Sequence, residues 1–445
     1  METATTEVDR RARLVGLWSV LGALVTALVL LVAGITTWSV WGGVLVAPIL
    51  VVISVSAFRR QARREGDSDL FALLLVALAV KLAGSIVRYF VAYSVYGGVA
   101  DATGYHGWGV RLADGFWHGQ FDTGLQDLSG TDFIRFLTGL VYTVIGPSRM
   151  GGFLLFSWLG FLGLYLFYRA FVIAVPEGRR RTYAVLVFFL PSLVYWPSSI
   201  GKEAWMMLAL GLAAFGAAKM LTGAIRSGAV PLGVGLWFAW LVRPHVAGLV
   251  AIALAGGFLM KKSSSQARLL APVGKAVAFT GLVAIALVLV MQTDRFLKNA
   301  GFKPQQGITA VLTGVQERTQ QGGSSFAPSV FESPARAPVA AVTVLFRPLI
   351  VDAHNVQALI SGIEGTFLFL FALVRYRWIL AALGSIRRQP YVAFAIGYTA
   401  LFVVAFSSVA NFGLLARERT QLLPFFLVLL TIPPPNVRDA EPVVR

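Results

Sequence analysis

Long apolar stretches separated by short polar segments run along almost the whole chain. Many of these stretches contain about 20 residues, which is the length an α-helix needs to cross the hydrocarbon core of a bilayer. A transmembrane β-barrel would instead show short segments of alternating polarity. The pattern therefore predicts an all-α fold: a polytopic bundle of transmembrane helices that forms a single integral membrane domain over residues 1–445.

The apolar stretches predict about twelve spans, and two longer polar stretches, at about 96–148 and 293–345, predict extended loops. The first apolar stretch follows basic residues, as in a signal peptide. It is long and lacks a clear cleavage site, so we expect a retained helix. The predicted spans are approximately 14–35, 37–57, 70–95, 150–173, 183–197, 203–222, 230–242, 246–260, 269–292, 356–375, 390–409 and 421–433.

Basic residues mark one side of the membrane. Clusters of Lys and Arg lie at alternate turns of the predicted bundle, at 59–64, 179–181, 261–262 and 375–388. Short basic loops are retained on the cytoplasmic side. We therefore expect a multi-pass protein of the cell membrane with both termini in the cytoplasm and both long loops outside it.

Composition agrees with this class, because 57% of the residues are hydrophobic and only 13% are charged. A net charge of +17 is also typical of nucleic-acid-binding proteins. Here the basic residues lie mainly in short loops between spans, which the membrane orientation explains, and we expect no nucleic-acid partner. The chain has no cysteine, which excludes disulfides, thiolate metal ligands and a thiol nucleophile.

Ionisable residues lie at the outer ends of several predicted spans. Such groups are costly in lipid unless they face protein, water or a ligand. The expected topology puts them on one side of the membrane, and we interpret them as a substrate-binding face. They are Lys202, Glu203, Arg243, His245, Asp352, His354, Arg417 and Arg419. Lys81, deeper in the third span, requires a partner that the sequence does not identify.

The first long loop contains Asp101-Ala102-Thr103-Gly104-Tyr105-His106, followed by Leu112-Ala113-Asp114-Gly115. This order of an acidic residue, a Tyr four positions later and a Leu-Ala-x-Gly helix end resembles the first outer loop of GT-C fold glycosyltransferases. Gly146-Pro147 and Pro191 resemble later landmarks of that fold, so the resemblance covers about half of the chain. In the family the acidic loop follows the first span, whereas here it follows the third.

The second half, with Arg417-Glu418-Arg419-Thr420-Gln421 before the last predicted span, resembles membrane polymerases of lipid-linked polysaccharide repeats. Together the two resemblances imply an enzyme of the extracytoplasmic face. It would transfer a sugar or a glycan chain from a polyprenyl-phosphate or polyprenyl-diphosphate carrier to a glycan or lipid acceptor. The expected partners are this donor, the acceptor and membrane lipids, and no cofactor is expected.

In the GT-C pattern the loop carboxylate is a general base that takes the proton of the acceptor hydroxyl. Asp101 is the matching position, with Tyr105 and His106 beside it as substrate-binding residues. Arginine binds phosphate through its bidentate fork, so we expect the carrier phosphate at the three arginines of the polar face, with Lys202 as a point-charge alternative. These arginines are Arg243, Arg417 and Arg419.

Several alternatives remain open. Asp101 also suits the N-cap of a short interfacial helix, the arginines could reach the interface as ordinary helix-end residues, and Lys202-Glu203 could be an internal pair. The loop offers further acidic residues, Asp114, Asp122, Asp127 and Asp132. A divalent cation is an alternative ligand of Asp101, His106, His245 and His354, although no metal-binding spacing supports it. The alternative functions are a lipid-linked oligosaccharide flippase or secondary transporter, and a non-catalytic scaffold.

Overall fold

The computed structural model describes residues 37–66, 68–261, 334–353 and 356–435, with a few single residues and pairs between 280 and 326. These residues form helices and turns, and no β-strand occurs among them. The predicted all-α fold class is therefore confirmed for the described chain. The predicted spans at 14–35 and 269–292 lie outside the described residues.

Most of the described helices overlap the predicted spans, whereas those at 101–117, 130–145, 337–346, 376–385 and 412–418 lie between them. The described residues thus form helices both within and between the predicted spans. The helices are α2 (Trp38–Glu65), α3 (Ser68–Phe90), the π-helix η1 (Val91–Val95), α4 (Asp101–Trp117), α5 (Gly130–Ile145), α6 (Arg149–Ala174), α7 (Arg180–Phe189), α8 (Pro191–Tyr195), α9 (Lys202–Leu221), α10 (Ile225–Val242), α11 (Pro244–Met260), α14 (Ala337–Phe346), α15 (Val356–Val374), α16 (Tyr376–Ser385), α17 (Pro390–Phe406), α18 (Phe412–Glu418) and α19 (Leu423–Leu429), with 3-10 turns η4 (Pro334–Arg336), η5 (Ile350–Asp352) and η6 (Arg419–Gln421).

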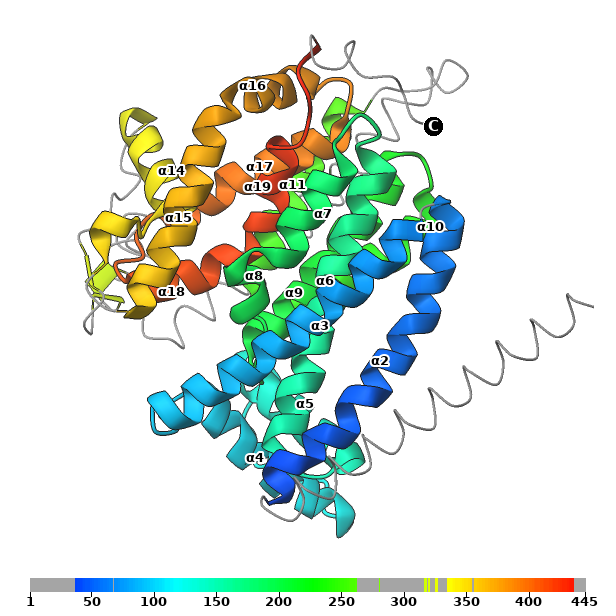
Figure 1. Ribbon diagram of the computed structural model, residues 1–445, viewed down its shortest axis with the longest axis vertical. Coiled ribbons are helices and arrows are strands. Elements are labelled where there is room, and N and C mark those ends of the chain that lie inside the picture. The colour runs from blue at the N-terminus through cyan, green and yellow to red at the C-terminus, as the bar shows by residue number, and fades with distance from the viewer. Residues whose placement is uncertain are drawn as a thin grey trace, which may run out of the picture. The chain divides into compact units, whose positions relative to one another are not determined.

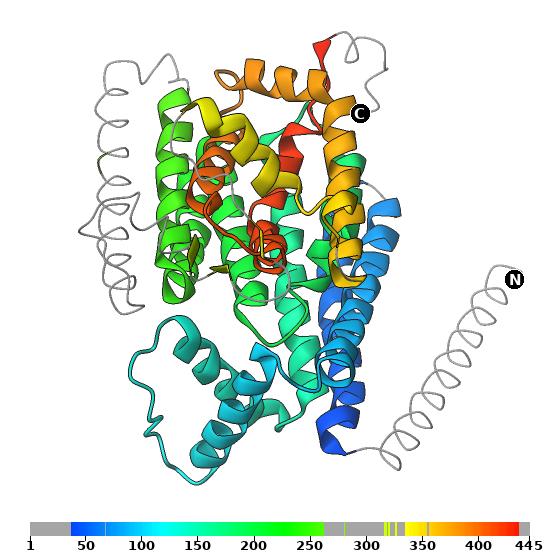
Figure 2. The same ribbon diagram turned by 90° about the vertical axis from the view of Figure 1, so that its left-hand side faces the viewer.

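Five of the described helices are long and apolar enough to cross a membrane: Trp38–Glu65, Asp69–Val95, Arg149–Ala174, Lys202–Leu221 and Ile225–Val242. A sixth is obtained if α15 and α16, which meet at a bend of 67° (Figure 2), are counted as one span. Three shorter helices, α11, α14 and α17, are also apolar. These helices are consistent with a membrane protein.

Two predicted spans are not single helices. The segment predicted at 183–197 forms α7 and α8, with a break at Leu190. Pro191 causes the break, because proline disfavours helical backbone in the residue before it and is accepted at the start of a new helix. The segment predicted at 421–433 contains the end of η6 and the seven-residue helix α19, whose second residue is Pro424.

The chain forms two compact units. The first contains Met1–Leu75, Tyr89–Gly124 and Arg135–Leu155, and the second contains Val76–Arg88, Leu125–Ile134 and Phe156–Arg445. In the first unit α4 packs closely on α5. A Cβ on Gly109 of α4 would come within 2.5 Å of Thr138, and one on Gly139 of α5 within 2.6 Å of Leu112.

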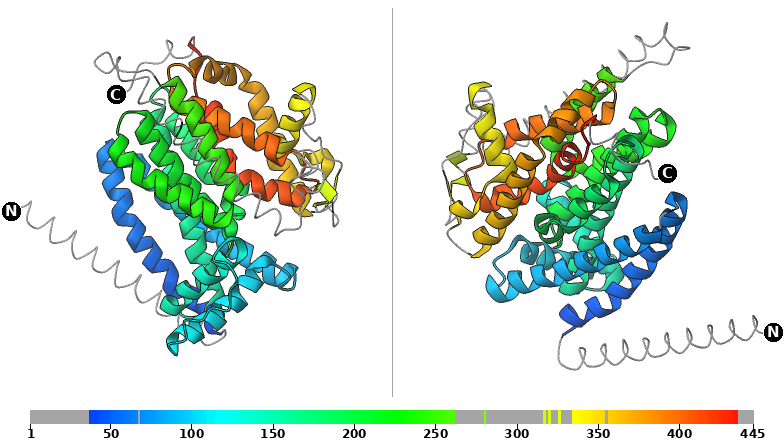
Figure 3. Two further views of the ribbon diagram at one scale, coloured as in Figure 1. Left: turned by 180° about the vertical axis from the view of Figure 1, so that it is seen from behind. Right: turned by 45° about the horizontal axis from the view of Figure 1, so that its top comes forward.

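The second unit is a bundle built around buried apolar helices. Its α9 and α10 lie side by side (Figure 3), and α17 packs against both α11 and α19 (Figure 1). Aromatic rings fill the centre, where the Phe425 ring lies 4.4 Å from Tyr398, 5.0 Å from Phe167 and 5.3 Å from Phe394.

Two glycines let α6 and α9 approach almost to backbone contact in the second unit. A Cβ on Gly211 of α9 would lie 2.3 Å from the carbonyl oxygen of Gly163, and one on Gly163 would lie 2.2 Å from the carbonyl oxygen of Met207. Backbone atoms cannot move aside as a flexible side chain can. Close approach of this kind is how small residues drive helix packing inside membranes.

We predict that Gly211→Ala lowers the free energy of unfolding by about 1–3 kcal/mol, because the new methyl group overpacks the contact with α6. The measurement is thermal or denaturant unfolding of the purified protein in detergent. Gly233→Ala is the matched control, since a Cβ on Gly233 of α10 meets no atom within 4 Å. Equal stability of the two variants would contradict the packing described here.

Candidate functional site

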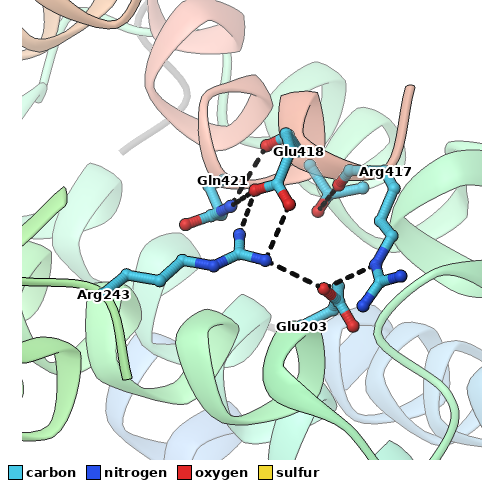
Figure 4. Close-up of polar contacts among 6 residues, drawn as sticks. Glu203, Arg243, Arg417, Glu418 and Gln421 are labelled. Atoms are coloured by element: carbon cyan, nitrogen blue, oxygen red, sulfur yellow. Dashed lines mark hydrogen bonds and ion pairs between the residues drawn. The ribbon is translucent and has the colours of Figure 1, made fainter. Parts of the chain in front are cut away.

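A buried ionic network joins the ends of α9, α10, α11 and α18 in the second unit (Figure 4). Arg243 lies at its centre. Its Nη2 donates to Glu418 Oε1 at 2.7 Å and to Glu203 Oε1 at 3.1 Å, and its Nη1 donates to Glu418 Oε2. The guanidinium of Arg243 is thus held by two carboxylates that are far from it in sequence.

Two further residues complete the network. Arg417 forms an ion pair with Glu203, with 2.7 Å between Nε and Oε1. Gln421 donates from Nε2 to Glu418 Oε2 at 2.6 Å. The two arginines balance the two glutamates in charge, so the network satisfies the requirement that buried charges be paired and hydrogen-bonded.

The members of the network differ in exposure. The side chain of Arg417 is 21% exposed, compared with 10% for Arg243, 9% for Glu418 and 5% for Glu203. Arg417 is therefore the member with the greatest access to solvent or to a ligand, and Arg243 is an interior bridge.

Local sequence explains how these residues reach the network. Pro244 starts α11 and holds Arg243 in an extended conformation (φ −142°, ψ 81°), so the chain turns at Arg243 between α10 and α11. Glu203 lies in the first turn of α9, where the helix dipole favours a negative charge. Asn411 caps α18, its Oδ1 accepting a hydrogen bond from Leu414 N at 3.0 Å.

Lys202 and His245 belong to the surroundings of the same network. The positive charges of Arg243 and Lys202 both act on His245. Lys202 and His245 are half-buried. The structure therefore brings together five residues from three separate regions of the chain that were predicted from the sequence to bind substrate. They are Lys202, Glu203, Arg243, His245 and Arg417.

Arg419 and Asp352 have other surroundings in the second unit. The Arg419 side chain is buried, and its Nη1 donates to the carbonyl oxygens of Leu345 at 3.2 Å and Arg347 at 3.0 Å, at the end of α14. Asp352 accepts two hydrogen bonds from Arg347, at 3.0 and 2.6 Å. Both residues hold the segment after α14 in place. His354 lies outside the described residues.

Asp101, Tyr105 and His106 belong to the first unit, on α4. Asp101 is exposed in the first turn of the helix, and Ala100 occupies the N-cap position. Tyr105 and His106 are buried, and His106 Nδ1 is hydrogen-bonded to the Tyr142 hydroxyl at 2.8 Å. Of these three predicted residues, Asp101 is the accessible one.

The structure identifies the partner of Lys81. This buried residue of α3 donates from Nζ to the carbonyl oxygens of Leu193 at 2.6 Å and Val194 at 3.3 Å. Two turns further along α3, Arg88 donates to the Tyr195 hydroxyl at 2.8 Å and lies over the ring of Trp196. One face of α3 thus holds the segment that leads to Lys202 and Glu203.

Sequence reasoning missed the carboxylate of Glu364. It is buried on α15 and accepts hydrogen bonds from the backbone N–H of Ser192 at 2.6 Å and its hydroxyl at 2.5 Å. The sequence contains a signal for this residue. Glu364 is the single charged residue within the apolar stretch predicted at 356–375, apart from the arginine at its end, and a charge in such a stretch requires a partner. Among the described residues, no three acidic or histidine side chains gather as they would at a metal site.

Comparison of the chain with models of known protein families, with curated proteins and with solved structures gave no match. The resemblance to GT-C enzymes therefore depends on the loop motifs around Asp101 and on the landmarks at Gly146-Pro147 and Pro191.

We predict that Glu418→Gln lowers the free energy of unfolding by about 3–5 kcal/mol, since it leaves buried positive charge without its counter-ion. A double variant, Arg243→Met with Glu418→Leu, removes both charges. Its loss of unfolding free energy is expected to be smaller than the sum of the losses measured for Arg243→Met and Glu418→Leu alone. Unfolding in detergent measures both effects. Arg387→Gln, at an exposed position, is the control, and a Glu418→Gln variant as stable as this control would show that the pair is not buried.

Stability is also expected to depend on pH through His106. Burial, and then the charge of Arg149, lower the pKa of His106 from 6.5 to about 4. The unfolded chain therefore binds more protons between these values, so the contribution is complete above pH 6.5 and is lost as pH falls toward 4. His106→Asn is expected to flatten the fall of melting temperature between pH 7 and pH 4.5.

The control for this experiment is His118→Asn, which changes an exposed histidine just after the same helix. It is expected to keep the pH profile of the unchanged protein. Identical profiles for His106→Asn and the unchanged protein would mean that His106 is not protected from protonation in the folded state.

Proposed function

We propose that the protein is an integral membrane glycosyltransferase or polysaccharide polymerase of the GT-C type. It transfers a sugar or a glycan chain from a polyprenyl-phosphate or polyprenyl-diphosphate carrier to a glycan or lipid acceptor at the extracytoplasmic face. The proposal includes about twelve spans, cytoplasmic termini, and outer loops at 96–148 and 293–345.

The observation that carries this proposal is the ionic network at the helix ends. Glu203, Arg243 and Arg417 come from distant parts of the sequence and meet in one place. Charged residues in membrane helices are rare and usually mark a substrate or ion pathway. Their gathering supports a polar site bordered by apolar helices, as expected for an enzyme that handles a charged group on a lipid.

The proposed chemistry needs one accessible carboxylate. Asp101 takes the proton of the acceptor hydroxyl as its oxygen forms a bond to the anomeric carbon of the sugar. The bond between that carbon and the carrier phosphate breaks, and its electron pair leaves with the phosphate. The exposure of Asp101 in the first turn of α4 supports this role.

The cations have different roles within the proposal. Arg243 and Arg419 position the helices, because two carboxylates bind the guanidinium of Arg243 and two backbone carbonyl oxygens accept from Arg419 Nη1. Arg417 and Lys202 provide positive charge at the more accessible edge of the network, where it stabilises an anionic substrate or leaving group.

The broken helices favour a second candidate, a flippase or secondary transporter for lipid-linked oligosaccharides. Discontinuous helices that carry charged groups are a feature of transporter binding sites. The second unit has such breaks at Leu190, at Arg243 and between α15 and α16. Movement of a lipid-linked oligosaccharide across liposomes, without new glycosidic bonds, would favour this candidate.

We predict that Asp101→Asn lowers transfer by at least about 100-fold, as expected for loss of a general base. The assay uses purified protein in liposomes with a panel of synthetic polyprenyl-phosphate sugars, and mass spectrometry detects the new glycosidic product. Asp114→Asn, an exposed position on the same helix, is the matched control and is expected to retain activity. Full activity of Asp101→Asn would reject Asp101 as the base.

A further inference from the structure

Arg149 is a cation that no carboxylate of the described chain neutralises. It is the first residue of α6 and lies over the ring of Tyr93, with 5.1 Å from its guanidinium carbon to the ring centre. It makes no ion pair among the described residues, and its buried Nε has no hydrogen-bond partner there. In this it differs from Arg243 and Arg347, each of which is bound by carboxylate oxygens.

The charge of Arg149 acts on neutral side chains. Its charge acts on Tyr89, Tyr93, His106 and Tyr142, all in the first unit. Burial raises the pKa of Tyr142, so its hydroxyl stays protonated, and His106 is neutral at physiological pH. A positive charge among neutral, partly buried groups is expensive unless a counter-ion is present.

A second donor lies beside this charge. The buried hydroxyl of Tyr93 lies near Thr103, yet it makes no hydrogen bond of normal geometry within the described chain. The Thr103 hydroxyl itself donates to the carbonyl oxygen of Gly98 at 2.7 Å. The Tyr93 hydroxyl and the Arg149 guanidinium thus offer unused donors, and a buried donor without an acceptor destabilises the folded protein.

The position in the fold favours an anion at this place. Arg149 begins a helix of 26 residues, and the N-terminal end of such a helix adds positive potential. The guanidinium fork matches phosphate oxygens, and a tyrosine hydroxyl donates one further hydrogen bond. The site also belongs to the same unit as Asp101, whose helix supplies Thr103 and His106.

We propose that Arg149 and Tyr93 bind a phosphate group carried by a membrane lipid. The assignment of this group to the polyprenyl carrier of the sugar donor rests on the proposed function. Arg149 neutralises the phosphate through two N–H groups, and Tyr93 donates to a third oxygen. The phosphate is thereby bound in the unit that contains the proposed base.

The test is a binding measurement that needs no sugar transfer. The full chain is placed in phosphatidylcholine nanodiscs, and its affinity for decaprenyl phosphate and for decaprenol is measured by native mass spectrometry or microscale thermophoresis. A hydrogen bond to a charged group contributes about 1.5–3 kcal/mol, so Arg149→Gln is expected to weaken decaprenyl phosphate binding by about 10- to 100-fold. Decaprenol binding is expected to be unchanged.

Arg111→Gln is the matched control, because Arg111 is exposed, belongs to the same unit and also lies over an aromatic ring, that of Trp108. It is expected to bind decaprenyl phosphate as the unchanged protein does. Tyr93→Phe removes only a hydroxyl and keeps the test valid if Arg149→Gln fails to fold; it is expected to weaken binding about 3- to 10-fold. Unchanged affinity in a folded Arg149→Gln variant, or in Tyr93→Phe, would overturn the site.

Two further arms identify the source of the phosphate and separate this proposal from the enzymatic one. Competition by phosphatidylglycerol or inorganic phosphate at the same affinity would overturn the assignment to the carrier. Binding that depends on Arg149 in a protein that transfers no sugar would uphold the site and reject the glycosyltransferase. An Arg149→Gln variant with normal transfer and normal binding would reject the phosphate site and uphold the glycosyltransferase.

Discussion

The second unit depends on one requirement, that a guanidinium buried among apolar helices be surrounded by acceptors. Arg243 meets this requirement through Glu418 and Glu203, which lie at the ends of α18 and α9. Removing either carboxylate would leave charge in a medium that solvates it poorly. The network therefore fixes where four helix ends meet, and the aromatic core around Phe425 packs behind that arrangement.

Helix breaks supply hydrogen-bond donors and acceptors to other buried polar side chains. Where proline interrupts a helix, backbone groups lose their partners within the helix and become available to side chains. Glu364 accepts the N–H of Ser192 after the break at Pro191, and Lys81 binds carbonyl oxygens a few residues later. The same logic applies to Arg419 at the end of α14. Polar residues in these apolar helices thus bind the ends of other helices, and these contacts make the packing of the helices specific.

The arginines of the chain separate into two kinds. Arg243 is bound by two carboxylates and Arg419 Nη1 by two backbone carbonyl oxygens, and both arginines act through the positions of the helices they join. Arg149 has a charge that the described chain does not balance, beside a tyrosine hydroxyl that makes no hydrogen bond of normal geometry with the described residues. The first kind explains why the helix ends are polar. The second kind is where an external anion would bind most favourably. Sequence position did not distinguish them, because each lies at the end of an apolar stretch.

The amino-acid sequence by itself determined the helical class and the positions of the long apolar helices, because hydropathy is a local property. It also placed Lys202, Glu203, Arg243 and Arg417 at helix ends. It did not predict the break at Leu190 within the stretch expected at 183–197. The partner of each charge was decided by tertiary structure: Lys81 meets Leu193, 112 residues away, and Arg243 meets Glu418, 175 residues away. Such pairs depend on which helices pack together, and a pattern read along the chain contains no information on distances between its distant parts. For the same reason Arg149 appeared in the sequence as an ordinary residue at the start of a helix, and its unbalanced charge became evident from its neighbours in the fold.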